Sequence, residues 1–310
     1  MPRRVLREAQ HREARKQARA PLGALHLLQV SARTQARYRA AASKFQAHHL
    51  ANNWPLASNW EELDAQLCSF LQFLWEDGEP KGYAADVLSG VQFFLQTRRP
   101  FPGSWRLLTT WQKTEIACQA PPLPRQILFA IAGVAMHIKM PRMAAILLLG
   151  YHCLLRTGEL LDVEKEDILL DASGTGVLCL KATKTSQRTG AREMVRIDDC
   201  LVGLFLARAM AGMPAQSRLM PCSADTFKFF FSEVVTLLDA PAALRPYSIR
   251  RGGATWDFLA HGCVQRTMLR GRWQSLRAAR LYVQDGAAAL TEVQLSPTCA
   301  ARCAQLQLQL

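Results

Sequence analysis

Two stretches in the second half of the sequence place arginines where an anion would explain them. Arg156 ends an apolar helical segment and is followed by Thr-Gly-Glu, an arrangement that would point its guanidinium out of the core. Ser248 is a candidate N-cap, which would put Arg250 and Arg251 in a helix's first turn, where the dipole disfavours cations. Amides and guanidiniums at such a helix end can share a phosphate. The pattern predicts phosphate binding, although Arg156 alone also fits an ordinary charge at a helix C-terminus.

Three further side chains could take part in the same chemistry. Lys184 lies in a polar loop between two expected strands, where a lysine is usually just solvated. Trp273 has polar neighbours, so its indole N–H could donate to a phosphate oxygen. Tyr282 lies on an expected short amphipathic helix, where an aromatic side chain most often packs in the core. Each residue alone indicates little, and their order along the chain indicates more.

The order Arg156, Lys184, Arg250, Trp273 and Tyr282 resembles the tyrosine recombinase (phage integrase) family. The local sequences around the two arginines, Leu-Leu-Arg-Thr-Gly-Glu-Leu and Ser-Ile-Arg-Arg-Gly-Gly-Ala-Thr, strengthen the resemblance. It covers the whole second half of the chain. The helical first half looks like the core-binding domain of that family, although it carries no diagnostic motif.

The resemblance implies a role for each matched residue. Arg156 and Arg250 would bind the scissile phosphate and neutralise the charge of the pentavalent transition state, a task that suits planar guanidiniums. Lys184 would protonate the departing 5′ oxygen. Tyr282 would be the nucleophile and form a 3′-phosphotyrosyl bond, which keeps the energy of the phosphodiester. The family therefore implies strand exchange without metal, ATP or any cofactor.

Two further positions match the family and one departs from it. Glu159 matches the acidic residue that supports the first arginine, and Trp273 the residue that hydrogen-bonds the phosphate. Tyr247 stands where the family usually has the histidine of a His-x-x-Arg motif. A phenol with a pKa of about 10 can donate a hydrogen bond to the phosphate but is a poor base at neutral pH. Because losing a general base typically costs about 10²- to 10⁴-fold, Tyr247 implies a slower or a degenerate enzyme.

Three functions remain open on these grounds. The first is a site-specific recombinase or integrase that acts on double-stranded DNA as a homo-tetramer on paired sites, and that is a monomer or dimer when free. The second is a domesticated DNA-binding protein that no longer cuts, and the third is a relaxase similar to type IB topoisomerases. For each of them we expect contacts to the DNA backbone from Arg37, Lys44, Arg251 and Arg272.

A mostly helical chain with a small antiparallel sheet must position these residues. Helical periodicity is clear in both halves, and alternating strands are expected only at Val177–Ala182 and Glu193–Ile197. Together with this pattern, the resemblance implies an N-terminal helical, SAM-like core-binding domain and a C-terminal integrase-type catalytic domain. The boundaries that we expect are a basic tail at 1–22, the core-binding domain at 23–117, a linker at 118–122, the catalytic domain at 123–285, and a C-terminal segment at 286–310 that packs in cis or docks on a neighbouring protomer.

Composition restricts the setting in which this chemistry would occur. The 310 residues carry a net charge of +13 with both halves basic, which suits a polyanionic partner. An apolar content of 49% argues against wholesale disorder. Nine cysteines without a CxxC pair predict neither disulfides nor a metal site, and favour a reducing interior. No apolar run is long enough to cross a bilayer. From the cysteines and the resemblance we expect an intracellular protein located with DNA, in the nucleus of a eukaryote or the nucleoid or cytoplasm of a prokaryote.

Overall fold

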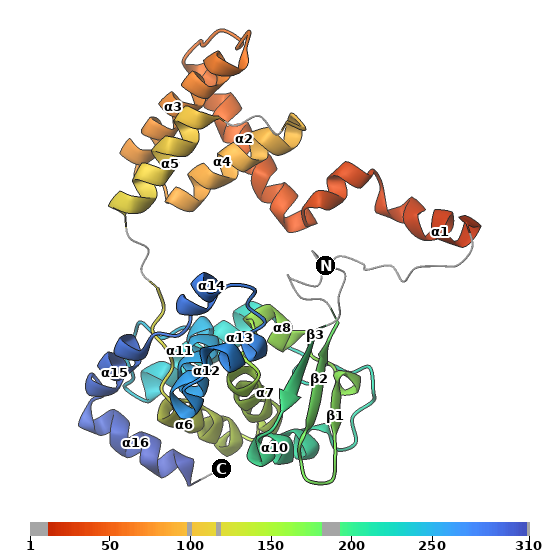
Figure 1. Cartoon of the computed structure of the whole chain (residues 1–310). Coiled ribbons are helices and arrows are strands. Elements are labelled where there is room, and N and C mark those ends of the chain that lie inside the picture. The colour runs from red at the N-terminus through yellow and green to blue at the C-terminus, as the bar shows by residue number, and fades with distance from the viewer. Residues whose placement is uncertain (1–11, 98–100, 116–118, 182–192, 309–310) are drawn as a thin grey trace. The chain divides into compact units, whose positions relative to one another are not determined.

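The chain forms two compact units, Met1–Cys118 and Gln119–Leu310 (Figure 1). This computed structural model describes residues 12–97, 101–115, 119–181 and 193–308. The expected fold class is confirmed, because helices dominate both units and the strands form one small antiparallel sheet. None of the helices in these described ranges is long and apolar enough to cross a membrane. The domain boundaries inferred from composition stay predictions.

In residues 12–97 and 101–115 of the first unit, all regular elements are helices. They are α1 (Arg12–Arg19), two short 3₁₀ turns, α2 (Ala32–Ala51), α3 (Trp60–Glu76), α4 (Lys81–Phe94) and α5 (Pro102–Thr114). Ser31 and Asn59 cap α2 and α3 with their side-chain oxygens. The apolar stripe of α3 lies in the core with Val87 of α4. Helical periodicity also predicts that Phe94 and Leu95 point inward, but at the end of α4 both side chains are exposed.

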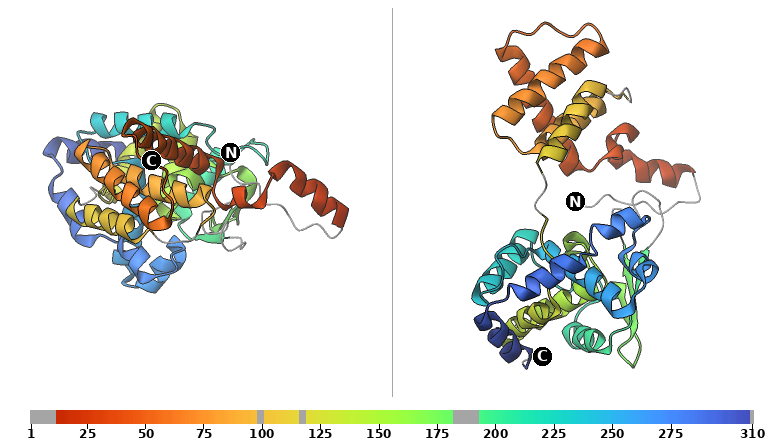
Figure 2. Two further views of the ribbon diagram at one scale, coloured as in Figure 1. Left: turned by 90° about the horizontal axis from the view of Figure 1, so that it is seen from above. Right: turned by 60° about the vertical axis from the view of Figure 1, so that its left-hand side comes forward.

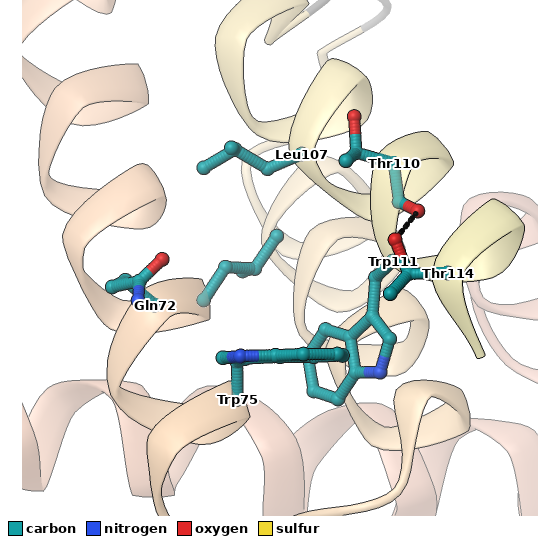
Figure 3. Close-up of a pocket in the computed structure, with 7 residues that line it drawn as sticks. Gln72, Trp75, Leu107, Thr110, Trp111 and Thr114 are labelled. Carbon is teal, nitrogen blue, oxygen red and sulfur yellow. Dashed lines mark hydrogen bonds between the residues drawn. The ribbon is translucent and has the colours of Figure 1, made fainter.

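A small apolar pocket lies between α3 and α5 of the first unit. Figure 3 shows the rings of Trp75 and Trp111 meeting edge to face, with centroids 5.2 Å apart. Leu107 and Thr110 are among the other side chains that line the volume of about 200 Å³. The lining contains no charged residue, and none of the residues expected to do chemistry belongs to it.

The second unit holds the residues of interest. Its elements, in order, are α6 (Arg125–His137), α7 (Pro141–His152), α8 (Thr157–Leu161), β1 (Ile168–Leu170), β2 (Gly176–Leu180), β3 (Glu193–Ile197), α10 (Cys200–Met210), α11 (Ala224–Leu237), α12 (Pro246–His261), α13 (Val264–Gly271), α14 (Leu276–Arg280), α15 (Asp285–Val293) and α16 (Pro297–Gln307). Helix α7 is buried on nearly all sides at the centre of the core. The sheet lies at one side of the unit and α16 at the other (Figures 1 and 2).

The sheet contains one strand more than the sequence pattern indicates. Strands β2 and β3 pair antiparallel, with Leu178 opposite Val195. Strand β1 adds to the free edge of β2 with Ile168 opposite Leu178. Three residues are too few to show an alternating pattern, so β1 could not be recognised from the sequence. Both Leu178 and Val195 are buried, and they hold this face of the sheet against the core.

Helix α12 carries the second expected arginine and packs backbone to backbone on its neighbours. A Cβ atom on Gly253 would lie 2.1 Å from the backbone oxygen of Tyr151 in α7. A Cβ on Gly252 would lie equally close, at 2.1 Å, to the backbone oxygen of Leu123. Only glycine allows this approach, which fixes α12 between α7 and the first residues of the unit.

Two local predictions near the expected site are wrong. Helix α12 starts at Pro246, not after Ser248, because proline at the first helical position has its φ angle preset for a helix. Ser248 instead accepts a hydrogen bond from the backbone N–H of Arg245, at 3.1 Å. Helix α14 ends at Arg280, so Tyr282 lies in the turn that follows and not on the helix.

The C-terminal segment folds onto its own unit. Helix α16 begins at an N-cap, Ser296, and packs along α6, where Cys299 and Cys303 are buried. A Cβ on Gly133 of α6 would lie 2.3 Å from the backbone oxygen of Leu306, so this contact is also very close. In this single chain α16 packs on α6, and docking of the segment on a neighbouring protomer stays a prediction.

Replacing Gly253 with alanine tests whether the approach of α12 to α7 needs glycine. The added methyl group meets backbone that cannot rotate away, so we expect Gly253→Ala to lower the free energy of unfolding by about 1–3 kcal/mol. Gly286→Ala is the matched control, since a Cβ there meets nothing within 4 Å. Denaturant unfolding of both variants measures the effect, and equal midpoints for Gly253→Ala and the unmodified chain would contradict the packing argument.

Candidate active site

Arg156 and Glu159 form the first part of the site, at the start of α8. Arg156 is the N-cap residue, and the Glu159 carboxylate accepts from its backbone N–H at 2.9 Å and from its Nη1 at 2.5 Å. This capping box satisfies a free N–H at the start of the helix. It also fixes the direction of the guanidinium, which remains 28% exposed.

The carboxylate of Glu159 is shared with two more arginines. Arg272 Nη2 donates to it at 2.6 Å, and Arg250 Nη1 lies 3.7 Å away. The side chain is only 6% exposed. Burial by itself would raise the pKa of Glu159, but the guanidiniums of Arg272 and Arg156, with the Arg156 amide, hold the pKa below its usual value. Glu159 is therefore ionised at neutral pH and neutralises part of a cluster of three cations.

Arg250 is the most buried of the three arginines, with 1% of its side chain exposed. Its Nη1 donates to the backbone oxygen of Leu154 at 2.5 Å, and its Nη2 donates to that of Gly271 at 2.8 Å. The guanidinium carbon lies 5.1 Å from the ring centroid of Trp273 and 5.0 Å from that of Tyr282. Burial, with repulsion from the neighbouring arginines, lowers the pKa of Arg250 to about 10. The group is therefore charged at neutral pH.

Two turns with unusual backbone angles supply the carbonyls that hold Arg250. Leu154 has a φ of 50° and Arg272 a φ of 58°. Non-glycine residues pay about 1–2 kcal/mol for this left-handed conformation. The turn after α7 directs the backbone oxygen of Leu154 at Arg250, and the turn after α13 directs the backbone oxygen of Gly271 at the same side chain. Gly271 allows its turn because a Cβ there would lie 2.2 Å from the ring of Trp273.

Tyr282 is held from several sides. Its ring stacks on Trp273 with centroids 4.6 Å apart and an interplanar angle of 29°. Its hydroxyl accepts a hydrogen bond of 2.7 Å from the hydroxyl of Tyr247, and its backbone oxygen accepts one of 3.2 Å from Thr255. Burial would raise the pKa of Tyr282, but the bond from Tyr247 and the charges of Arg250 and Arg156 lower it below the usual value. The phenol is fixed in place and is made more acidic.

Several buried N–H donors in this region have no acceptor with suitable geometry among the described residues. They are Nε of Arg250, Nε and Nη1 of Arg272, and the indole Nε1 of Trp273. An unpaired buried donor typically costs about 1–3 kcal/mol. Arg250 and Trp273 lie against the ring of Tyr282, so the site has a surplus of donors that suits a ligand with several acceptor oxygens. A phosphate group has that character.

Five of the six residues expected to be catalytic come together with Glu159 in this site, namely Arg156, Tyr247, Arg250, Trp273 and Tyr282. The sixth, Lys184, lies outside the described residues. Lys181, at the end of β2, forms ion pairs of 2.5 Å with Glu164 and 2.6 Å with Glu166. Those carboxylates hold it at the base of the loop.

Each of the four residues expected to contact the DNA backbone has a partner within the chain. Arg251 is 4% exposed and donates to Gln119 at 2.7 Å. Arg272 is turned inward by its left-handed backbone and pairs with Glu159, so neither arginine has the exposed position expected of it. Arg37 pairs with Asp86 in the first unit. Lys44 is paired in the same way with Glu79.

Sequence reasoning missed part of the site. Arg272 is expected at the surface, yet it bridges Glu159 and Glu193, with its Nε 3.3 Å from the latter carboxylate. Gly271 signals the end of a helix, but nothing in the sequence shows that the next residue points inward. Glu193, at the start of β3, has no motif around it. In the described part of the chain, no group of three His, Cys, Asp or Glu side chains could hold a metal ion.

Comparison with solved structures shows which known proteins share this fold. The Tn1549 transposon integrase in complex with transposon right-end DNA is 11% identical, covers 90% of this chain and 98% of its own, and superposes with a TM-score of 0.62. A lambda integrase dimer bound to a COC′ core site is 12% identical, with 88% and 95% covered and a TM-score of 0.56. No protein-family model matches the sequence, and no curated protein matches it. The fold that the resemblance implies is confirmed, because the chain has the fold of these tyrosine recombinases.

Proposed function

We propose that this chain is a site-specific DNA recombinase that cuts and rejoins double-stranded DNA through a 3′-phosphotyrosyl intermediate. One observation carries the proposal. Arg250, the indole of Trp273 and the Tyr282 phenol, whose pKa is lowered, are in contact with one another. Several buried N–H groups of Arg250, Arg272 and Trp273 have no acceptor among the described residues. The structural neighbours were solved as integrases bound to DNA, which supports the same class of activity.

The arginines would bind the phosphate before and during the reaction. Arg156 is the most exposed of the three guanidiniums of the cluster and would meet a non-bridging oxygen first. Arg250 is immobilised by two backbone oxygens and by Glu159, so it need not reorganise when charge develops on phosphorus. Preorganised donors of this kind typically contribute about 10²- to 10³-fold each to the rate.

Tyr282 would supply the nucleophile. Its Oη attacks phosphorus, the Oη–P bond forms and the P–O5′ bond breaks, which leaves the DNA 3′ end on the protein and a free 5′ hydroxyl. The departing oxygen needs one proton, and by resemblance Lys184 would donate it. Attack by a 5′ hydroxyl from another strand reverses these steps and completes the exchange. Phosphodiester energy is kept in the phosphotyrosyl bond, so no ATP is consumed.

Recombination between two sites would require several copies of the chain. We propose a homo-tetramer on paired sites, with free protein as monomer or dimer. A DNA-binding protein without cleavage and a topoisomerase-like relaxase are the competing functions, and the following experiments distinguish them.

Changing Tyr282 to phenylalanine removes the proposed nucleophile. We expect the unmodified chain to become covalently trapped on a nicked suicide duplex, and Tyr282→Phe to give no covalent complex while still binding the duplex. A gel shift that survives denaturation measures trapping. Tyr38→Phe, in the first unit, is the matched control and should trap normally.

Two other outcomes would redirect the assignment. If the unmodified chain binds DNA and never traps, the protein is a binding protein. If it relaxes supercoiled plasmid without preference for any sequence, the relaxase is correct.

Changing Glu159 to glutamine leaves three guanidiniums, two of them buried, without their shared anion. Breaking a buried pair typically costs about 3–5 kcal/mol, so we expect a large loss of unfolding free energy at pH 7. Because the pKa of Glu159 is lowered in the folded state, its contribution is complete above the unfolded pKa of about 4.3 and is lost as pH falls through the folded value. The difference in unfolding free energy between Glu159→Gln and the unmodified chain, measured by denaturant unfolding, should therefore become smaller below about pH 4. The exposed Glu233→Gln is the control, and a gap that stays constant from pH 7 to pH 3 would contradict a charge-based role.

Affinity for duplex DNA should depend strongly on salt. A protein that makes 6–10 phosphate contacts loses about 10³- to 10⁵-fold in affinity between 50 and 200 mM salt, because bound counterions are released. Because this chain has a net charge of +13, we expect its affinity for duplex DNA, measured by fluorescence anisotropy, to fall by a factor in this range. A change of less than about tenfold would show that the charge excess is not used for the DNA backbone.

A further inference from the structure

The two phenols of the site are in direct contact. The hydroxyls of Tyr247 and Tyr282 lie 2.7 Å apart, and Tyr247 is the donor. The two rings are tilted by 48° with centroids 5.8 Å apart. Tyr247 is the second residue of α12 and is 41% exposed, whereas Tyr282 follows α14 and is half-buried. The contact therefore joins an outer phenol to the inner one that lies against Trp273 and Arg250.

The surroundings decide which of the two phenols carries a negative charge. Arg250 and Arg251 of α12 and Arg156 at the start of α8 face the pair, and Arg250 lies against the Tyr282 ring itself. Burial, and a hydrogen bond that Tyr247 must give up when it ionises, raise its pKa to about 12, while that of Tyr282 is lowered. The carboxylate of Glu159 is paired with Arg156 and lies 3.7 Å from Nη1 of Arg250. Tyr282 is thus the phenol that ionises first, and Tyr247 keeps its proton.

A phenol that keeps its proton has a limited choice of roles. Tyr247 cannot accept the proton of Tyr282 near neutral pH, because a base needs a pKa near the working pH. It can stabilise the phenolate, since a hydrogen bond to a charged oxygen is about twice as strong as one to a neutral oxygen.

We propose that Tyr247 is a catalytic residue that donates a hydrogen bond to the attacking oxygen of Tyr282, so that Tyr282 reacts as a phenolate stabilised by its neighbour. This rests on the proposed function. The Tyr282 proton passes to water or hydroxide, the Oη–P bond forms, the P–O5′ bond breaks, and the 5′ oxygen takes a proton from the general acid. On rejoining, the P–Oη bond breaks and Tyr247 stabilises the departing phenolate. Tyr247 ends each step with the proton it began with.

A titration without DNA tests the pairing alone. The chain has five tyrosines, so tyrosinate absorbance near 295 nm can be followed in the full-length protein and in variants whose folding is checked by circular dichroism. We expect the most acidic phenol to disappear in Tyr282→Phe and to shift upward by about one pH unit in Tyr247→Phe. An unchanged titration in Tyr247→Phe overturns the proposal, as does loss of the acidic phenol in Tyr247→Phe together with its retention in Tyr282→Phe.

The pH dependence of trapping tests the consequence for catalysis. On a saturating suicide duplex, Tyr247→Phe should trap about 10- to 100-fold more slowly at pH 7, and the difference should shrink at higher pH as Tyr282 ionises without help. Tyr247→His should recover rate at pH 7, because a base with a pKa of about 6.5 is then present. A purely structural role would slow trapping equally at every pH.

The two experiments can fail separately. If no variant and not even the unmodified chain traps, the proposed function fails, and the titration still decides whether Tyr247 acidifies Tyr282. If trapping occurs and Tyr247→Phe slows it by the same factor at every pH, the proposed function stands and the role of Tyr247 is overturned.

Discussion

The site depends on one buried carboxylate. Glu159 stands between Arg156, Arg250 and Arg272, and without it three guanidiniums would share a region from which water is largely excluded. Like charges at such distances repel strongly in a medium of low effective dielectric, and each guanidinium has also lost hydration. The carboxylate offsets one charge and leaves a local excess of positive charge. On the proposed function, this excess of positive charge would attract the scissile phosphate.

Main-chain oxygens, together with the Glu159 carboxylate, hold the guanidinium of Arg250 in place. The turns at Leu154 and Gly271 place carbonyl dipoles against Arg250, and neither turn is relaxed. Strain of this kind is kept when the surrounding structure fixes it, and here it is fixed by α7, α12 and α13 packing in contact. The side chain of Arg250 is therefore held in one position by backbone acceptors. This explains how one side chain can be fully buried and still belong to a charged site.

The sequence was sufficient for the parts of the molecule that follow periodic or ordered signals. Helical periodicity located most helices, and the order of Arg156, Arg250, Trp273 and Tyr282 was enough to predict a common site. What failed depends on the direction of single turns. Arg272 has a left-handed φ angle, which turns its side chain inward. The residue types around it do not predict this backbone conformation. The start of α12 was misplaced because Ser248 is a good cap by type, whereas Pro246 upstream had already begun the helix. The burial of Arg251 depends on Gln119, 132 residues earlier in the chain, and such distant pairing leaves no trace in a single sequence.

That same pairing has a mechanical consequence. The chain enters the second unit at Gln119, whose side chain holds Arg251, and the amide of Leu123 donates to the backbone oxygen of Ser248 at 3.0 Å. Gly252 lets the backbone of Leu123 lie directly on α12. The entering strand of chain is thus fastened to the helix that carries both Tyr247 and Arg250. A shift of residues 119–123 would therefore act directly on α12, and so on the position of Arg250.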